Sequence, residues 1–86
     1  MASYRVAIKA SAAKELEALT KKDCARVAAR IGGLAREPRP PGVEKLSGDG
    51  KYRIRQGDYR IIYAVDDDER TVTIVKIGHR REVYRG

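Results

Sequence analysis

Hydrophobic and polar positions alternate at the start of the chain. Tyr4, Val6 and Ile8 are separated by polar or small residues between Ser3 and Lys9. A period of two residues is typical of a half-buried strand, because successive side chains point to opposite faces. We therefore predict a first strand over this segment.

The spacing then becomes helical. Ser11 is a suitable N-cap for a first helix from Ala12 to Leu19, and Asp23 is a suitable N-cap for a second. In the second helix the apolar residues recur at i, i+4 and i+7, which predicts one buried stripe formed by Val27, Ile31 and Leu34. Gly32 and Gly33 within it predict either close backbone packing or a kink late in the helix.

A proline-rich connector ends the helical half. Residues 37–42, Glu-Pro-Arg-Pro-Pro-Gly, cannot continue a helix, because proline lacks the amide hydrogen and restricts the residue before it. Three runs rich in Tyr, Ile, Val and Thr follow, at residues 51–56, 58–65 and 71–77. Short polar turns separate them, so consecutive strands should pair antiparallel.

These elements predict one α+β domain over residues 1–86. Two N-terminal helices should pack on one face of a small curved antiparallel sheet, in the order β-α-α-β-β-β with a short C-terminal tail. The opposite face of the sheet should stay open.

Charge narrows the class of partner. The chain has 19 Lys and Arg residues against 12 Asp and Glu residues, a net charge of +7 and a pI near 9.9. Such a balance favours a polyanion. No apolar run approaches the roughly 18 residues of a spanning helix, and no signal peptide pattern leads the chain, so nucleic acid is favoured over membrane and a cytoplasmic location is expected.

Basic residues align on the predicted strands. Residues two apart on a strand share a face about 6.6 Å apart, so Lys51, Arg53 and Arg55 should point together. If Arg60 of the next strand shares that face, three guanidinium groups line one groove. The alternative is that all four are ordinary solvated strand residues.

The C-terminal tail adds further polar chemistry. His79 is the one side chain whose unperturbed pKa lies near neutrality, and Tyr84 can stack on a base or orient a phosphate. The alternatives are a surface histidine and a tyrosine that packs on the core. Arg80, Arg81 and Arg85 complete the basic tail.

Other chemistry has little support. Cys24 is the single cysteine, which excludes an internal disulfide and a cysteine-based metal site, and the acidic run at residues 66–69 is expected to be a solvated hairpin loop. There is no Walker loop, paired-carboxylate site or nucleophile motif. Phosphodiester cleavage remains, because RNA carries its own nucleophile in the 2′-hydroxyl and needs only alignment, charge neutralisation and proton movement. No metal or other cofactor is expected.

The residues also resemble a known family. The segments Lys45-Leu46-Ser47-Gly48, Tyr52-Arg53-Ile54-Arg55, Gly57 to Tyr63 and Ile77 to Tyr84 together resemble the RelE branch of the RelE/ParE toxin superfamily. The resemblance covers almost the whole chain. The Gly-x-Tyr-Arg-x-x-Tyr strand is shared by both branches, whereas the Gly-His-Arg-Arg-x-Val-Tyr tail favours RelE.

The resemblance implies a ribosome-dependent messenger RNA endonuclease that is held inactive by a cognate RelB-like antitoxin in a hetero-oligomeric complex. It implies a phosphate-binding Arg60, a proton-donating Arg80 and a C-terminal Tyr84, with Arg53 and Arg55 where the bacterial type member has lysines. We expect the catalytic set to be Arg55, Arg60, Arg80, Tyr84 and His79. We expect the RNA-binding set to be Lys51, Arg53, Arg81, Arg85 and Lys45.

The general base stays open at this point, since arginine keeps its charge and is a poor base. His79 next to Arg80 is one choice, and water with purely electrostatic help from the arginines is the other. Two other functions also stay open: a ParE-like toxin that poisons gyrase without hydrolysis, and a cleavage-dead module that only binds an antitoxin.

Overall fold

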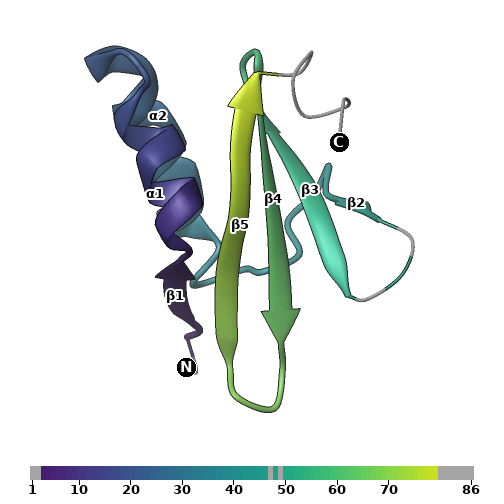
Figure 1. Cartoon of the computed structure of the whole chain (residues 1–86). Helices are drawn as coiled ribbons and strands as arrows, with labels where there is room; N and C mark the ends of the chain where they lie inside the picture. Colours follow the sequence, from purple (N-terminus) through teal and green to yellow (C-terminus); the bar gives the residue numbers. More distant parts are fainter. Residues whose placement is uncertain (1–2, 47, 49, 80–86) are drawn as a thin grey trace.

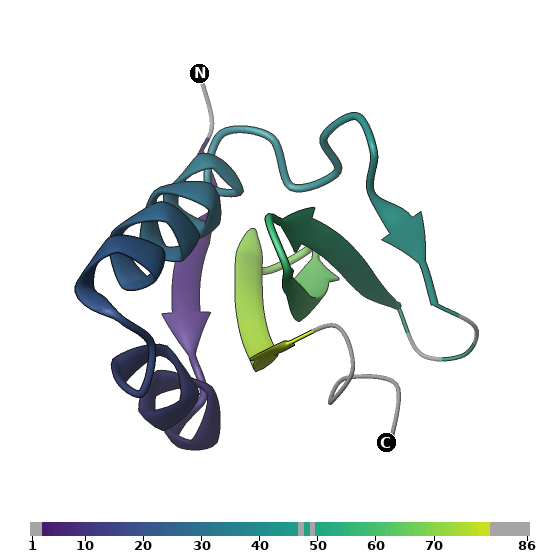
Figure 2. The same cartoon turned by 90° about the horizontal axis from the view of Figure 1, so that it is seen from above.

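The computed structural model describes residues 3–46, 48 and 50–79. A five-stranded sheet in the order β1-β5-β4-β3-β2 is covered on one face by two helices (Figures 1 and 2). In chain order the elements are β1 (Arg5–Ile8), α1 (Ala10–Glu17), α2 (Lys21–Gly33), β2 (Glu44–Lys45), β3 (Lys51–Gln56), β4 (Tyr59–Asp66) and β5 (Thr71–His79). The predicted α+β class is confirmed.

The sheet is mixed rather than wholly antiparallel. The hairpins β3–β4 and β4–β5 are antiparallel as predicted, but β1 pairs in parallel with β5. The chain leaves β1 through both helices and enters the sheet at its far edge as β2, and three antiparallel reversals then bring β5 back to the direction of β1. The short strand β2 pairs with β3 and was not predicted, because two residues carry no readable period.

Both predicted N-caps were wrong. The first helix begins at Ala10, so Ser11 lies inside it, and its N-cap Lys9 makes no side-chain hydrogen bond. The N-cap of α2 is Thr20, whose hydroxyl accepts a hydrogen bond from the amide of Asp23 at 3.2 Å. A carboxylate three residues after a capping threonine complements the helix dipole, so Asp23 supports the helix from its first turn.

The core lies between the helices and the sheet. Its buried members are Ala12, Val27, Ile31, Leu34, Ile54, Ile61, Tyr63, Val72, Ile74 and Ile77. The register between β4 and β5 shifts at Ile62 and Tyr63, and Val75 is skipped by the pairing. This bulge places both Ile74 and Ile77 in the core, although residues three apart on a regular strand face opposite sides.

The two helical glycines do not provide close packing. Gly32 and Gly33 are both exposed, and a Cβ atom at either position would meet no atom within 4 Å. They are the last two residues of α2. Glycine is a poor helix former, so their position is consistent with the end of the helix there. The expectation of close backbone packing was wrong.

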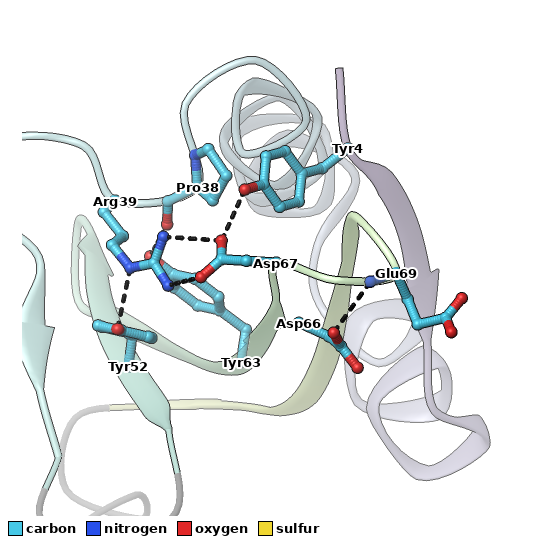
Figure 3. A network of polar contacts seen from close by, with 8 residues as sticks. All are labelled: Tyr4, Pro38, Arg39, Tyr52, Tyr63, Asp66, Asp67 and Glu69. Atoms are coloured by element: carbon cyan, nitrogen blue, oxygen red, sulfur yellow. Dashed lines mark hydrogen bonds and ion pairs between the residues drawn. The ribbon is translucent and has the colours of Figure 1, made fainter. Parts of the chain in front are cut away.

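A polar network ties the connector to the β4–β5 loop (Figure 3). The Arg39 guanidinium donates to both carboxylate oxygens of Asp67, at 3.1 and 2.9 Å, and to the hydroxyl of Tyr52 at 2.9 Å. The hydroxyl of Tyr4 donates to Asp67 at 2.6 Å, and that of Tyr63 donates to the Pro38 carbonyl at 2.7 Å. Asp67 is therefore an anchor of the connector and not merely a solvated loop residue.

Candidate functional site

The side chains that could act on RNA lie on the sheet face opposite the helices, which we call the open face. The cross-strand register places Arg55 of β3 opposite Arg60 of β4, and Arg60 opposite Gly78 of β5. In the next row of this face, Arg53 lies opposite Ile62, and Ile62 opposite Lys76. Residues opposite one another in antiparallel strands share a face. The predicted alignment of Arg53, Arg55 and Arg60 on one face is thus confirmed, and Lys51 belongs to the same face by alternation along β3.

Arg60 is the buried member of this set. Its exposed fraction is 6%, and one guanidinium nitrogen donates to the carbonyls of Gly57 at 3.3 Å and Tyr59 at 3.1 Å. No carboxylate within the described residues pairs with it. Arg55 lies directly across the strands and is exposed, so two like charges face each other at the end of β3.

Arg53 has a different environment. Its guanidinium donates to one carboxylate oxygen of Glu44 on β2, through Nε at 3.3 Å and a terminal nitrogen at 3.2 Å. The Arg53 side chain is 18% exposed and that of Glu44 is 57% exposed. The ion pair orients Arg53 along the open face and supplies a carboxylate that a bound phosphate would have to displace.

Sequence reasoning missed Lys76. Simple alternation from Val72 would place this residue with Val72 and Ile74 on the core side. Because the bulge at Val75 shifts the register, Lys76 instead lies opposite Ile62 on the open face. No sequence signal marks the bulge, apart from the break in alternation between Ile74 and Ile77.

Two predicted site residues lie on the helix-covered side. Lys45 is opposite Tyr52, whose ring stacks on Tyr63 with centroids 5.8 Å apart. His79 is opposite Tyr59 at the end of β5, and the two rings meet edge to face with centroids 6.0 Å apart. The sheet therefore separates both side chains from Arg55 and Arg60.

His79 instead borders two hollows beside the helices. One of about 340 Å³ is lined by Asp23, Arg26, Val27, Gln56, Gly57, Asp58, Tyr59 and His79. The other, of about 370 Å³, is lined by Glu15, Ala18, Leu19, Tyr59, Ile77, Gly78 and His79. The Tyr59 hydroxyl donates to Asp23 at 3.3 Å, and Glu15 accepts from the amide of Ile77 at 2.9 Å. These bonds fix the sheet end to both helices.

The polar network around Asp67 shifts the pKa values of its own members. The hydrogen bonds from Arg39 and Tyr4 lower the pKa of Asp67, and the bond to Asp67 raises the pKa of Tyr4. Burial raises the pKa of Tyr63 to about 12. Among the described residues, no His, Cys, Asp and Glu side chains group in a way that could hold a metal ion, and no helix there is long and apolar enough to cross a membrane.

Four predicted residues of the tail lie outside the described residues. They are Arg80, Arg81, Tyr84 and Arg85. Their roles stay predictions from the sequence.

Comparison with known proteins places the chain in a family. Residues 6–84 match the family model of the ParE toxin of the type II toxin-antitoxin system parDE. Toxin RelE of Mycobacterium tuberculosis (strain ATCC 25618 / H37Rv) is 39% identical over 85 residues, covering 95% of this chain and 87% of the relative. Toxin RelG of the same organism is 33% identical over 84 residues, covering 95% and 97%.

Solved structures agree with that assignment. The archaeal RelE-RelB complex from Pyrococcus horikoshii OT3 matches with a TM-score of 0.82 and 37% identity, over 91% of this chain and 96% of the other. The toxin-antitoxin complex RelBE2 from Mycobacterium tuberculosis matches with a TM-score of 0.80 and 32% identity, over 91% and 99%. The chain belongs to the RelE branch of the RelE/ParE superfamily and is a toxin of a type II toxin-antitoxin system.

Proposed function

We propose that this toxin is a ribosome-dependent messenger RNA endoribonuclease that a cognate antitoxin holds inactive. Its relatives with 39% and 33% identity are named Toxin RelE and Toxin RelG. The matching structures from Pyrococcus horikoshii and Mycobacterium tuberculosis are complexes of such a toxin with its antitoxin. A RelB-like protein is accordingly the partner that we propose for this chain, in a hetero-oligomeric complex in the cytoplasm.

The arrangement of Arg55 and Arg60 carries the proposal. Among the described residues, the buried Arg60 guanidinium donates to backbone carbonyls and to no carboxylate, and it faces a second guanidinium across the strands, which is an unfavourable electrostatic environment. A phosphate bound between the two groups would relieve it, because planar guanidinium groups form strong charge-assisted hydrogen bonds to phosphate. Gly78, on the other side of Arg60, adds no side chain that would block this position.

The proposed reaction is attack of the 2′-oxygen of a ribose on the adjacent phosphorus. The bond from phosphorus to the 5′-oxygen breaks, which leaves a 2′,3′-cyclic phosphate and a 5′-hydroxyl. Arg55 and Arg60 would neutralise the charge that develops on the phosphate oxygens. By family resemblance, Arg80 would donate the proton to the leaving oxygen and Tyr84 would hold a base.

The proton of the 2′-hydroxyl needs an acceptor. His79 was one candidate, but its ring lies beside Tyr59 on the helix-covered side, away from Arg55 and Arg60. We therefore favour water or hydroxide as the acceptor. Arg53, Lys51 and Lys76 would bind flanking phosphates of the messenger.

Primer extension on messages from cells that express the chain tests the proposal. Wild type should give discrete cuts, and Arg60→Ala should lose roughly 10- to 150-fold in cleavage rate, since one charge-assisted hydrogen bond contributes about 1.5–3 kcal/mol. Arg36→Ala removes an exposed charge outside the open face and is the matched control. Undiminished cleavage by a well-folded Arg60→Ala variant would remove Arg60 from the site.

A ParE-like gyrase poison is the second candidate, because the matching family model bears that name. It predicts DNA damage with intact messages. A module that only binds an antitoxin predicts neither cuts nor damage. The same expression experiment, read for both RNA and DNA, separates the three.

A further inference from the structure

A second row of basic residues runs along α2, away from the open face. Lys22, Arg26 and Arg30 follow one another at intervals of four residues, and we call them the α2 flank. Lys22 and Arg26 are exposed and Arg30 is half-buried. With a rise of 1.5 Å per residue, the row spans about 12 Å beside the buried stripe of Val27 and Ile31.

Helix stability explains only Arg30 of this row, which lies in the last turn of α2, where the helix dipole favours a cation. Lys21 and Lys22 occupy the first turn of α2, where the helix dipole disfavours cations. Among the described residues none of the three flank residues forms an ion pair with a carboxylate. The nearby Asp23 accepts instead from the Tyr59 hydroxyl. Cations that lack a carboxylate partner among the described residues can bind an external anion, and three of them in one row favour a polyanion.

The flank and the open face are separate surfaces. Arg26 borders the 340 Å³ hollow together with Gln56 and Gly57, on the helix side of the β3–β4 turn. On the other side of that turn, Arg60 donates to the carbonyl of the same Gly57. One messenger strand bound along Arg55 and Arg60 therefore cannot also follow α2, because the sheet and its turn lie between them.

The chemistry of the flank favours RNA over protein. Its exposed neighbours on α2 are Ala25, Ala29 and Gly33, so the surface offers no aromatic or large aliphatic side chain. Protein interfaces depend on such anchors, whereas phosphate backbones are bound by evenly spaced cations. Helical RNA is recognised chiefly through its shape, phosphates and 2′-hydroxyl groups.

We infer that the α2 flank binds the phosphate backbone of helical ribosomal RNA while the open face holds the messenger. The inference rests on the proposed function, and it gives the ribosome a direct part in the reaction. The flank supplies docking and takes no part in bond cleavage, so it should change ribosome affinity and leave the chemical step alone.

The test compares two triple variants of the full-length toxin. One is Lys22→Gln/Arg26→Gln/Arg30→Gln, and the control, Lys9→Gln/Lys14→Gln/Arg36→Gln, removes three exposed charges elsewhere. Binding to purified ribosomes is titrated over a range of KCl concentrations, and circular dichroism verifies folding. Single-turnover cleavage of ribosome-bound messenger is then measured at saturating toxin.

The flank variant should bind ribosomes at least about tenfold more weakly near 100 mM salt. The slope of log K against log salt should fall by about 2–3, since each phosphate contact contributes roughly 0.7–0.9. Its cleavage rate at saturation should match wild type, whereas Arg60→Ala should show the reverse pattern.

Equal ribosome affinity of the flank and control variants would overturn the inference. So would loss of antitoxin binding with intact ribosome binding, which would make an acidic protein segment the occupant of the flank. Failure of the wild-type toxin to bind or cleave on ribosomes would instead refute the proposed function itself, so the two failures are distinguishable.

Discussion

The three arginines of the open face differ in how they are held. Arg60 is buried and bonded to the Gly57 and Tyr59 carbonyls, Arg55 is exposed, and Arg53 is paired with Glu44. A fixed cation stabilises a transition state without reorganisation, whereas an exposed one must first be ordered. Arg60 is therefore suited to the scissile phosphate and Arg53 to a flanking one.

Glu44 should weaken RNA binding by competing with phosphate for Arg53. Exposed ion pairs contribute about 0.2–1 kcal/mol, so Glu44→Gln should tighten binding to a 2′-O-methylated RNA oligonucleotide by up to about fivefold at low salt. Fluorescence anisotropy measures the change. In the Arg53→Gln background the same Glu44 substitution should have little effect; an equal gain in both backgrounds would show that only net charge matters.

The position of His79 leads to a prediction about pH. If water or hydroxide accepts the 2′-proton, the single-turnover cleavage rate on ribosomes should rise log-linearly with pH across neutrality. His79→Gln should then change the profile little. A bend near the unperturbed histidine pKa of about 6.5 in wild type, absent from His79→Gln, would restore His79 as the base.

At the scale of elements, sequence patterns succeeded where a period was long and regular. The third strand was predicted with its observed bounds, Lys51–Gln56, and both antiparallel hairpins followed from their polar turns. The failures have local physical causes. A two-residue strand has no period, Thr20 rather than Asp23 supplied the cap, and the bulge at Val75 reversed the face of Lys76.

The network around Asp67 should make the connector sensitive to acid. Because Arg39 and Tyr4 lower the pKa of Asp67 in the folded state, its contribution to stability is present above its unfolded pKa of about 3.9. The contribution is lost as pH falls through the lower folded pKa. Asp67→Asn should therefore destabilise the protein at pH 7 and make the loss of stability below pH 4 shallower, as measured by urea unfolding.

Asp68→Asn is a matched control for that measurement, since Asp68 is an exposed residue of the same loop. It should leave the free energy of unfolding nearly unchanged at both pH values. Identical acid limbs for wild type and Asp67→Asn would mean that the network does not persist in solution.

At the scale of the whole molecule, the +7 charge is divided between two sides of one sheet. The sequence indicated the basic side chains of the open face, because strand alternation fixes which residues point together. It did not indicate the α2 flank as a separate surface. That distinction depends on α2 packing against the core, which leaves its basic residues on the far side of the sheet from Arg55 and Arg60.

The division of charge bears on how the proposed antitoxin inhibits. An acidic segment that covers the open face would bind Arg53, Arg55 and Lys76 and would block the messenger site. Long-range attraction between unlike charges speeds encounter and is screened by salt, so the association rate should fall steeply as salt is added. Stopped-flow measurements with the cognate antitoxin would show this dependence.

Two variants identify the surface that the antitoxin uses. Arg53→Gln/Arg55→Gln/Lys76→Gln should slow association and flatten its salt dependence, because these side chains share the open face. The α2 flank variant carries the same loss of charge on the other side of the sheet, and its association rate should stay closer to that of wild type. A salt-independent rate in wild type would instead indicate that apolar packing forms the contact. Equal slowing in both variants would mean that net charge, rather than the open face, steers the antitoxin.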